Sequence, residues 1–327
     1  MPLFVRRGTV GAAAAASWST LLLAVSSPVS AHGAPAAPVD AWTALTTWSL
    51  EVPVVLPLVL AAVLYHWAVR AVDRAHPASR VPRRRVWAWD AGLIVLLVAL
   101  ESPVGTYDTT LFSAHMLQHL LLMMVAAPLL ALGAPITLLL RVVRPEARQR
   151  LILPFLRSRP MRALTFPVVA WVLFAGVLYV SHFSSLFDAA LENDAVHVLE
   201  HALYLSAALL FWWPVVGADP SPWRLPHPMR VFYLLIGMPW SSFLGLAILS
   251  APSVLYAHYA TLSRPWGPTP LADQQLAGGL MWAVGDGLFL GAMVLAIAAW
   301  LRSEEAEGRR LDAQLDRQTA AREGASE

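Results

Sequence analysis

Apolar residues in this chain are gathered into long runs that short polar segments separate. A helix that crosses a membrane needs about 17 to 25 predominantly apolar residues. Seven segments reach or approach this length, so the pattern predicts an all-α integral membrane protein with a bundle of seven transmembrane helices. The predicted spans are residues 50–69, 87–100, 111–140, 164–183, 195–216, 231–249 and 276–301.

The amino-terminal segment before these spans has the features of a secretory signal. Arg6 and Arg7 precede an apolar stretch that ends in small residues at Ser30 and Ala31. We expect a signal peptide cleaved after Ala31, or an uncleaved signal anchor. The predicted order is therefore signal segment 1–31, extracytoplasmic Ala/Pro-rich linker 32–47, membrane domain 48–301 and charged tail 302–327, partly helical or disordered.

Composition agrees with a protein whose solvent is lipid. The chain is 57% hydrophobic and 13% charged, and its mean hydropathy is +0.58, which is too apolar for a soluble domain. Its 23 basic residues are all arginine and fall into blocks, a grouping that carries membrane topology rather than affinity for nucleic acid. The chain has no cysteine, so a metal site would need imidazole, thioether, carboxylate or backbone ligands.

The arginine blocks alternate between successive loops. Residues 70–85 hold six arginines and residues 141–162 hold seven, whereas residues 101–110 and 184–194 hold none. Because arginine-rich loops stay in the cytoplasm, we predict a mature amino terminus outside and a cytoplasmic carboxyl terminus. We expect this multi-pass protein in a bacterial plasma membrane, in contact with lipid.

Two histidine pairs stand near the outer ends of predicted spans. His115 and His119 begin the third span, and His197 and His201 begin the fifth. The i, i+4 spacing places both imidazoles of a pair on one helical face. Each segment also has a polar residue three positions after its first histidine, Gln118 or Glu200, that could orient an imidazole.

Three further residues extend this constellation. His182 ends the fourth span at the same level, and Met123 continues the stripe of His115 and His119. Imidazole and thioether ligands without thiolate suit copper better than zinc, and polar residues inside spans tend to be functional, so we predict a copper site here. Asp286, between two glycines in the seventh span, is expected to support it or to form an interhelical hydrogen bond.

Several motifs in this order resemble the polytopic CtaG family of cytochrome c oxidase assembly factors. They are residues 99–104 (ALESPV), 115–124 (HMLQHLLLMM) leading to Gly133-Ala134-Pro135, 197–201 (HVLEH) leading to residues 211–214 (FWWP), and 271–276 (LADQQL). The resemblance runs from about residue 48 to 301. It implies a seven-span, non-enzymatic protein that matures a haem-copper oxidase by supplying or positioning copper. The expected partners are cytochrome c oxidase subunits and an extracytoplasmic copper donor.

Three other functions fit parts of the pattern. Histidines from two spans can ligate haem in a membrane redox protein. The HVLEH segment matches a short H-x-x-E-H metallopeptidase pattern, although the parallel segment has Gln118 where a base would be required. A copper permease would need ligands stepping across the bilayer, and beyond Met238 and Asp286 the inner half offers few.

Overall fold

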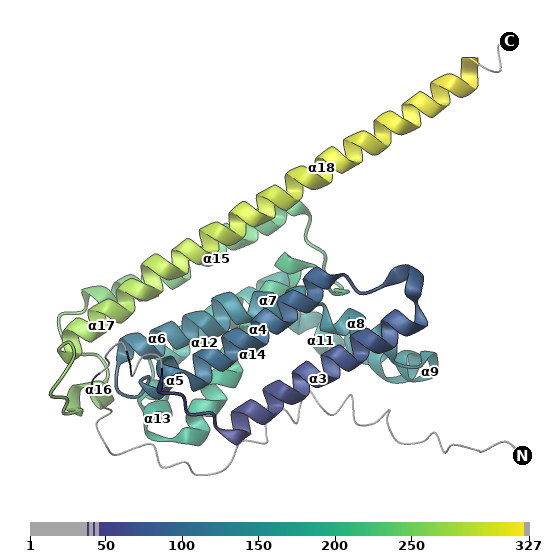
Figure 1. Ribbon diagram of the computed structural model, residues 1–327. Helices are drawn as coiled ribbons and strands as arrows, with labels where there is room; N and C mark the ends of the chain where they lie inside the picture. The colour runs from purple at the N-terminus through teal and green to yellow at the C-terminus, as the bar shows by residue number, and fades with distance from the viewer. Residues whose placement is uncertain (1–37, 39–41, 43–45, 324–327) are drawn as a thin grey trace, which may run out of the picture.

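The chain forms a bundle of long helices in the computed structural model, which describes residues 38, 42 and 46–323 (Figure 1). All regular elements among these residues are helical, as the sequence predicts. The predicted signal segment and its cleavage point at Ala31 lie outside the described residues.

Six helical segments of the described chain are long and apolar enough to cross a membrane. Helix α12 (Pro167–His182) is shorter, and it is bent by 70° against α13 (Leu186–Glu192); the two make a seventh span only if they count as one. The predicted seven spans are therefore six clear helices and one bent pair. The six are α3 (Val52–Ala75), Arg83–Thr106 (α4 Arg83–Glu101 and α5 Pro103–Thr106), Phe112–Val142, α14 (Asp194–Val216), α15 (His227–Ser250) and Pro270–Gln318.

The third and last spans each contain a π-helical turn. The third consists of α6 (Phe112–Leu120), the π turn η2 (Leu121–Ala126), α7 (Ala127–Leu132) and α8 (Pro135–Val142), and it breaks at Ala134, whose φ of 52° is left-handed. The last consists of α17 (Pro270–Gly279), η4 (Leu280–Val284) and α18 (Gly285–Glu323). Because π turns in long helices are frequent at functional sites, η2, which begins two residues after His119, draws attention to α6.

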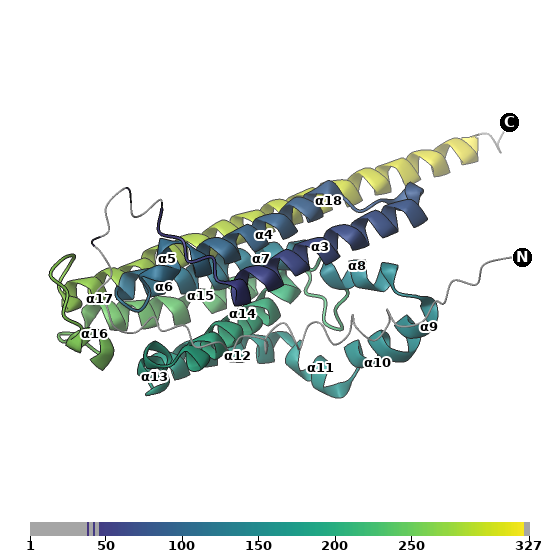
Figure 2. The same ribbon diagram turned by 60° about the horizontal axis from the view of Figure 1, so that its bottom comes forward.

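Packing places α6, α7 and α14 inside the bundle and α3 at its edge (Figure 2). Helix α14 packs on α12 and α7, and α7 packs on α4, while α15 lies along α17 and α18. Helix α3 contacts α4 and α8, and only 6% of its most apolar window is buried. Most of α3 is therefore left to face lipid or another protein.

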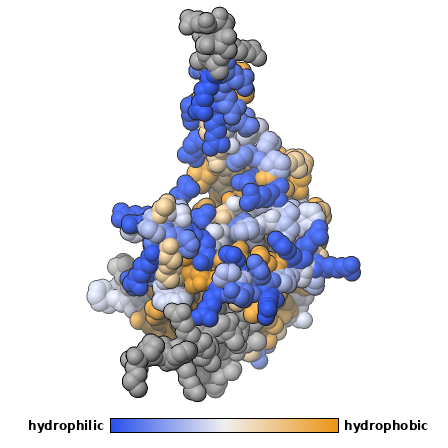
Figure 3. All heavy atoms as spheres, turned by 90° about the vertical axis from the view of Figure 1, so that its right-hand side faces the viewer, coloured by the Kyte–Doolittle hydropathy of each residue, from blue (hydrophilic) through white to orange (hydrophobic). Residues whose placement is uncertain are grey.

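The two ends of the bundle differ in chemistry. At one end lie α5, α13, α16 (Ala257–Thr261) and the starts of α6 and α14 (Figure 1). At the other lie the predicted arginine-rich loops, which include α9 (Pro145–Ala147), η3 (Arg148–Ile152), α10 (Leu153–Leu156) and α11 (Arg159–Leu164). Figure 3 looks at this second end and shows hydrophilic residues over much of it, with the end of α18 projecting beyond. The charged segment after Arg302 thus continues α18 as a helix through Glu323.

A buried carboxylate fixes the start of α6. Asp273 of α17 accepts hydrogen bonds from the backbone N–H of Phe112 at 2.7 Å and from the Ser113 hydroxyl at 2.5 Å. Arg264 approaches the same carboxylate at 3.8 Å, and both side chains are buried. Because the first N–H groups of a helix lack intrahelical partners, Asp273 acts as a cap supplied from another helix. The position of α6 is thereby tied to α17.

Candidate metal centre

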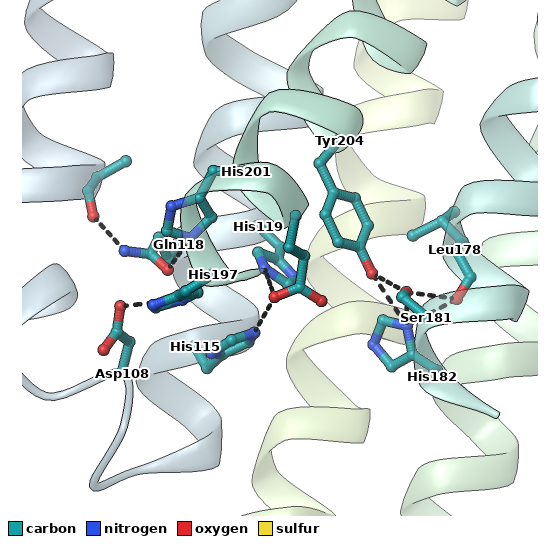
Figure 4. A network of polar contacts seen from close by, with 12 residues as sticks. Asp108, His115, Gln118, His119, Leu178, Ser181, His182, His197, His201 and Tyr204 are labelled. Carbon is teal, nitrogen blue, oxygen red and sulfur yellow. Dashed lines mark hydrogen bonds and ion pairs between the residues drawn. The ribbon is translucent and has the colours of Figure 1, made fainter. Parts of the chain in front are cut away.

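The two histidine pairs meet inside the bundle (Figure 4), near the starts of α6 and α14 and so at the end opposite the arginine-rich loops (Figure 1). Within each pair the two rings lie side by side, with centroids 4.2 Å apart for His115 and His119 and 4.3 Å apart for His197 and His201. Between the helices, the His115 and His197 rings are stacked 5.5 Å apart, and those of His119 and His201 are 5.9 Å apart. The faces of α6 and α14 that carry the pairs are therefore turned toward each other.

The polar residue of each histidine segment contacts the opposite helix. Gln118 Oε1 lies 2.8 Å from His201 Nε2, and the Gln118 amide donates to the Ala99 carbonyl of α4 at 3.1 Å. Glu200 Oε2 lies 3.8 Å from His115 Nε2 and 4.0 Å from His119 Nε2. Gln118 therefore contacts His201 across the interface between α6 and α14.

The centre is buried, and many of its polar atoms have no direct partner. The side chains of His115 and Glu200 are 0% and 1% exposed. Among the described residues, neither nitrogen of His115 or His119 and neither carboxylate oxygen of Glu200 has a hydrogen-bond partner. Leaving such groups unpaired costs about 1–3 kcal/mol each. An ion or water molecules at this point would remove that cost.

Two overlapping groups of side chains have metal-binding geometry. In one, Asp108, His115 and His197 place one ligand atom each within 4.8 Å of one another. In the other, His115, His119 and Glu200 do the same. His115 belongs to both groups, so it lies at the middle of the centre.

His182 borders the centre from α12. Its ring centroid is 6.4 Å from that of His119. Its Nδ1 is 2.8 Å from the Leu178 carbonyl and 3.2 Å from the Tyr204 hydroxyl, whereas the buried Nε2 has no partner among the described residues. Tyr204 also packs against His119, with ring centroids 4.2 Å apart. The backbone bond to Nδ1 therefore leaves Nε2 as the nitrogen that can bind a ligand.

Comparison with known proteins identifies the family of the chain. Residues 63–303 match the family described as cytochrome c oxidase caa3 assembly factor (Caa3_CtaG). The chain belongs to this family. It is 32% identical over 279 residues to an uncharacterized protein of Mycobacterium bovis and to one of Mycobacterium tuberculosis, covering 83% of this chain and 42% of each relative. It is 31% identical over 243 residues to an uncharacterized protein of Mycobacterium leprae, covering 72% of this chain and 37% of the relative.

The chain thus spans less than half the length of these curated relatives. No solved structure matches it.

The other motifs of this CtaG family member build the scaffold around the histidines. Buried Glu101, from the ALESPV run, accepts hydrogen bonds from the Ser49 hydroxyl at 2.8 Å and the Glu51 N–H at 2.7 Å. In the LADQQL run, Asp273 caps α6, and Gln274 accepts from the Leu255 N–H at 2.7 Å. Of these three residues, Asp273 bonds directly to a helix that carries a histidine pair, α6. Glu101 ties the segment before α3 to α4, and Gln274 ties the loop after α15 to α17.

Five of the predicted site residues belong to neither metal-binding group, namely His182, His201, Gln118, Met123 and Asp286. Met123 is buried in the apolar core on η2, where its carbonyl accepts from Trp212 Nε1 at 2.8 Å. Asp286, at the start of α18, accepts a hydrogen bond from the Ser242 hydroxyl of α15 at 2.7 Å. Of the two roles left open for Asp286, this contact is the interhelical hydrogen bond.

Sequence reasoning missed Asp108 as a site residue. It lies on the turn between α5 and α6, and its Oδ2 is 3.7 Å from His197 Nε2. A turn residue has no helical periodicity to assign it to a face, so only its acidic character and closeness to His115 in sequence could have indicated it.

Proposed function

We propose that this CtaG family member handles copper for the assembly of cytochrome c oxidase, at the centre formed by His115, His119, His197 and His201. One observation carries the proposal. Four imidazoles and a carboxylate from two neighbouring spans converge in a buried space, with several ring nitrogens unpaired among the described residues. The family description indicates cytochrome c oxidase as the partner, and the donor atoms of the centre indicate a metal ion.

The donor set fits copper. Imidazole nitrogen and carboxylate oxygen are ligands that copper accepts, and at equal geometry the divalent ion outcompetes the other first-row metals. His182 Nε2, buried and unpaired among the described residues, extends the nitrogen donors. Met123 adds a buried thioether one helical turn beyond His119, although it lies outside the two groups.

The arrangement of the rings favours a small ion over haem. Axial haem ligands approach the iron from opposite sides of the macrocycle. Here the His115 and His197 rings are stacked with 9° between their planes, 5.5 Å apart, and each has its pair partner beside it. Imidazoles in such close contact leave no room for a porphyrin between them.

The arginine distribution supports an outer position for the centre. The arginine-rich loops lie at the far end of the bundle from the starts of α6 and α14, which carry the histidine pairs (Figure 1). If these loops stay in the cytoplasm of a bacterial cell, the centre faces the outside. A copper donor outside the membrane and the copper-receiving subunits of the oxidase then meet it from the same side.

The test is the copper content of the purified chain. We expect copper to bind the wild-type protein and the affinity to fall by at least about tenfold in the double variant His119→Ala/His201→Ala. Cells that carry this variant, grown with copper just sufficient for wild type, should have lower cytochrome c oxidase activity at normal membrane abundance of the variant.

His76→Ala is the matched control. His76 is exposed at the carboxyl end of α3, away from the histidine centre, so its loss should change neither measurement. Wild-type copper binding and oxidase activity in the double variant would falsify the proposal. The histidines would then be interhelical packing residues.

A further inference from the structure

The two metal-binding groups differ in how close they lie to solvent. In the first, which we call the rim set (Asp108, His115, His197), His197 and Asp108 side chains are 14% and 7% exposed. In the second, the deep set (His115, His119, Glu200), no side chain is more than 5% exposed. An ion that arrives from the end of the bundle therefore meets the rim set first.

His115 joins the two sets. Its ring is stacked on that of His197 at 5.5 Å and lies 4.2 Å from that of His119. Figure 4 shows Asp108 on one side of His115 and the carboxylate that contacts His115 and His119 on the other. An ion can thus change its other ligands while it stays bound to His115, and it never has to lose all of its ligands at once.

The turn that carries Asp108 is held in place by α16. The Tyr259 hydroxyl donates to the Asp108 carbonyl at 2.5 Å, and His258 Nε2 is 2.8 Å from the Thr109 carbonyl. Tyr259 is itself buried. These contacts fix the backbone at the rim, so the position of the Asp108 carboxylate is built into the fold.

We propose that copper enters through the rim set and moves to the deep set by exchanging ligands around His115, with Asp108 as a ligand of entry only. The inference rests on the proposed function, because it concerns how copper reaches the same centre. It assigns a role to Asp108 that differs from that of Glu200. Asp108 controls the rate of loading, and Glu200 controls how tightly the loaded ion is held.

The experiment compares rates with affinity, using Cu²⁺ and the purified full chain in detergent. Loading is followed by the quenching of tryptophan fluorescence, and release by transfer to excess EDTA. Removal of a group that is used on the path but is absent from the final site lowers the association and dissociation rates by the same factor. We expect Asp108→Asn to slow both by about tenfold, in the range for groups near a metal, and to leave the dissociation constant unchanged. Glu200→Gln should raise the dissociation rate and leave the association rate unchanged.

Glu192→Gln is the control for general attraction of cations, since Glu192 is an exposed carboxylate at the end of α13 and Gln removes the same charge. Equal slowing in Glu192→Gln and Asp108→Asn would show steering by charge and overturn the proposal. Weaker binding in Asp108→Asn at an unchanged association rate would make Asp108 a permanent ligand and would also overturn it. Absence of copper binding in the wild-type chain would instead refute the proposed function.

Discussion

At the scale of single residues, the centre depends on side chains that reach across the interface between α6 and α14. Gln118 is the clearest case, because its oxygen faces His201 and its amide is fixed by the Ala99 carbonyl. A buried group that orients a ligand commonly changes metal affinity 10- to 100-fold when it is removed. Gln118 also fixes the tautomer of His201. Because Gln118 Oε1 can only accept a hydrogen bond, the proton must lie on His201 Nε2, and the electron pair that can bind a metal is on Nδ1.

We therefore expect Gln118→Met, which has a similar length but no hydrogen-bonding group, to weaken copper binding by about tenfold or more. Gln118→Glu keeps an oxygen opposite His201 and should retain more of the affinity. Competition with a copper chelator measures both. Equal affinities for Gln118→Met and wild type would show that the orientation of His201 does not matter for binding.

At the scale of helices, close contact between α15 and α17 supports the end of the bundle that holds the centre. A Cβ added at Gly278 would lie 2.5 Å from the Leu249 backbone nitrogen and 2.7 Å from the Gly245 carbonyl oxygen. Such distances are closer than atoms tolerate, so only glycine lets these two backbones approach. Helix α17 in turn supplies Asp273, which caps the start of α6.

Gly278→Ala should consequently destabilise the protein, because the backbones of α15 and α17 must separate, and overpacking of this kind costs about 1–3 kcal/mol. The neighbouring Gly279 offers a matched control, since a Cβ there has nothing within 4 Å. Gly279→Ala should be neutral or slightly stabilising, as alanine favours the helix. Thermal unfolding in detergent compares the two variants, and equal melting temperatures would contradict the close packing.

The helices themselves were more predictable than their contacts. Spacing alone placed His115 with His119 and His197 with His201, since four residues make about one helical turn. It could not show that the two faces meet, because that depends on packing between segments some 80 residues apart in sequence, as the separation of 83 between Gln118 and His201 illustrates. Helix α13 lies within residues 184–194, which the sequence predicts only as an outer loop, because a seven-residue helix is too short for its periodicity to be recognised.

At the scale of the whole molecule, charge and shape agree on a single axis. The starts of α6 and α14, which carry the two histidine pairs, lie at one end, and the arginine-rich loops and the projecting part of α18 lie at the other (Figure 1). The part of α18 beyond the bundle carries i, i+4 contacts of its own, such as Glu305 with Arg309 at 3.7 Å. A charged helix of this kind belongs in water, so the end of the bundle from which it projects marks a membrane surface.

This axis predicts the orientation in the membrane. A reporter enzyme fused after Ala306 should report the cytoplasm, and one inserted near Asp188 should report the outside, because arginine-rich segments are retained inside. A reporter enzyme that is active on only one side of the membrane, expressed in a bacterial host, shows on which side each fusion site lies. The opposite pair of results would place the histidine centre at the cytoplasmic surface and exclude an extracytoplasmic copper donor.

An aromatic layer lies between the histidines and the arginine-rich end of the bundle, and it affects whether an ion could cross the protein. Farther along α14 from the histidines, Phe211 and Trp212 are buried against Phe289 of α18, and Trp212 is hydrogen-bonded to the Met123 carbonyl. A hydrated cation has no favourable ligands in such a layer, and the guanidinium groups beyond it repel positive charge. If the centre holds an ion, this layer opposes its passage toward the arginine-rich end. The ion would then enter and leave at the end of the bundle where Asp108 and His197 lie, so donor and recipient would have to contact that end in turn.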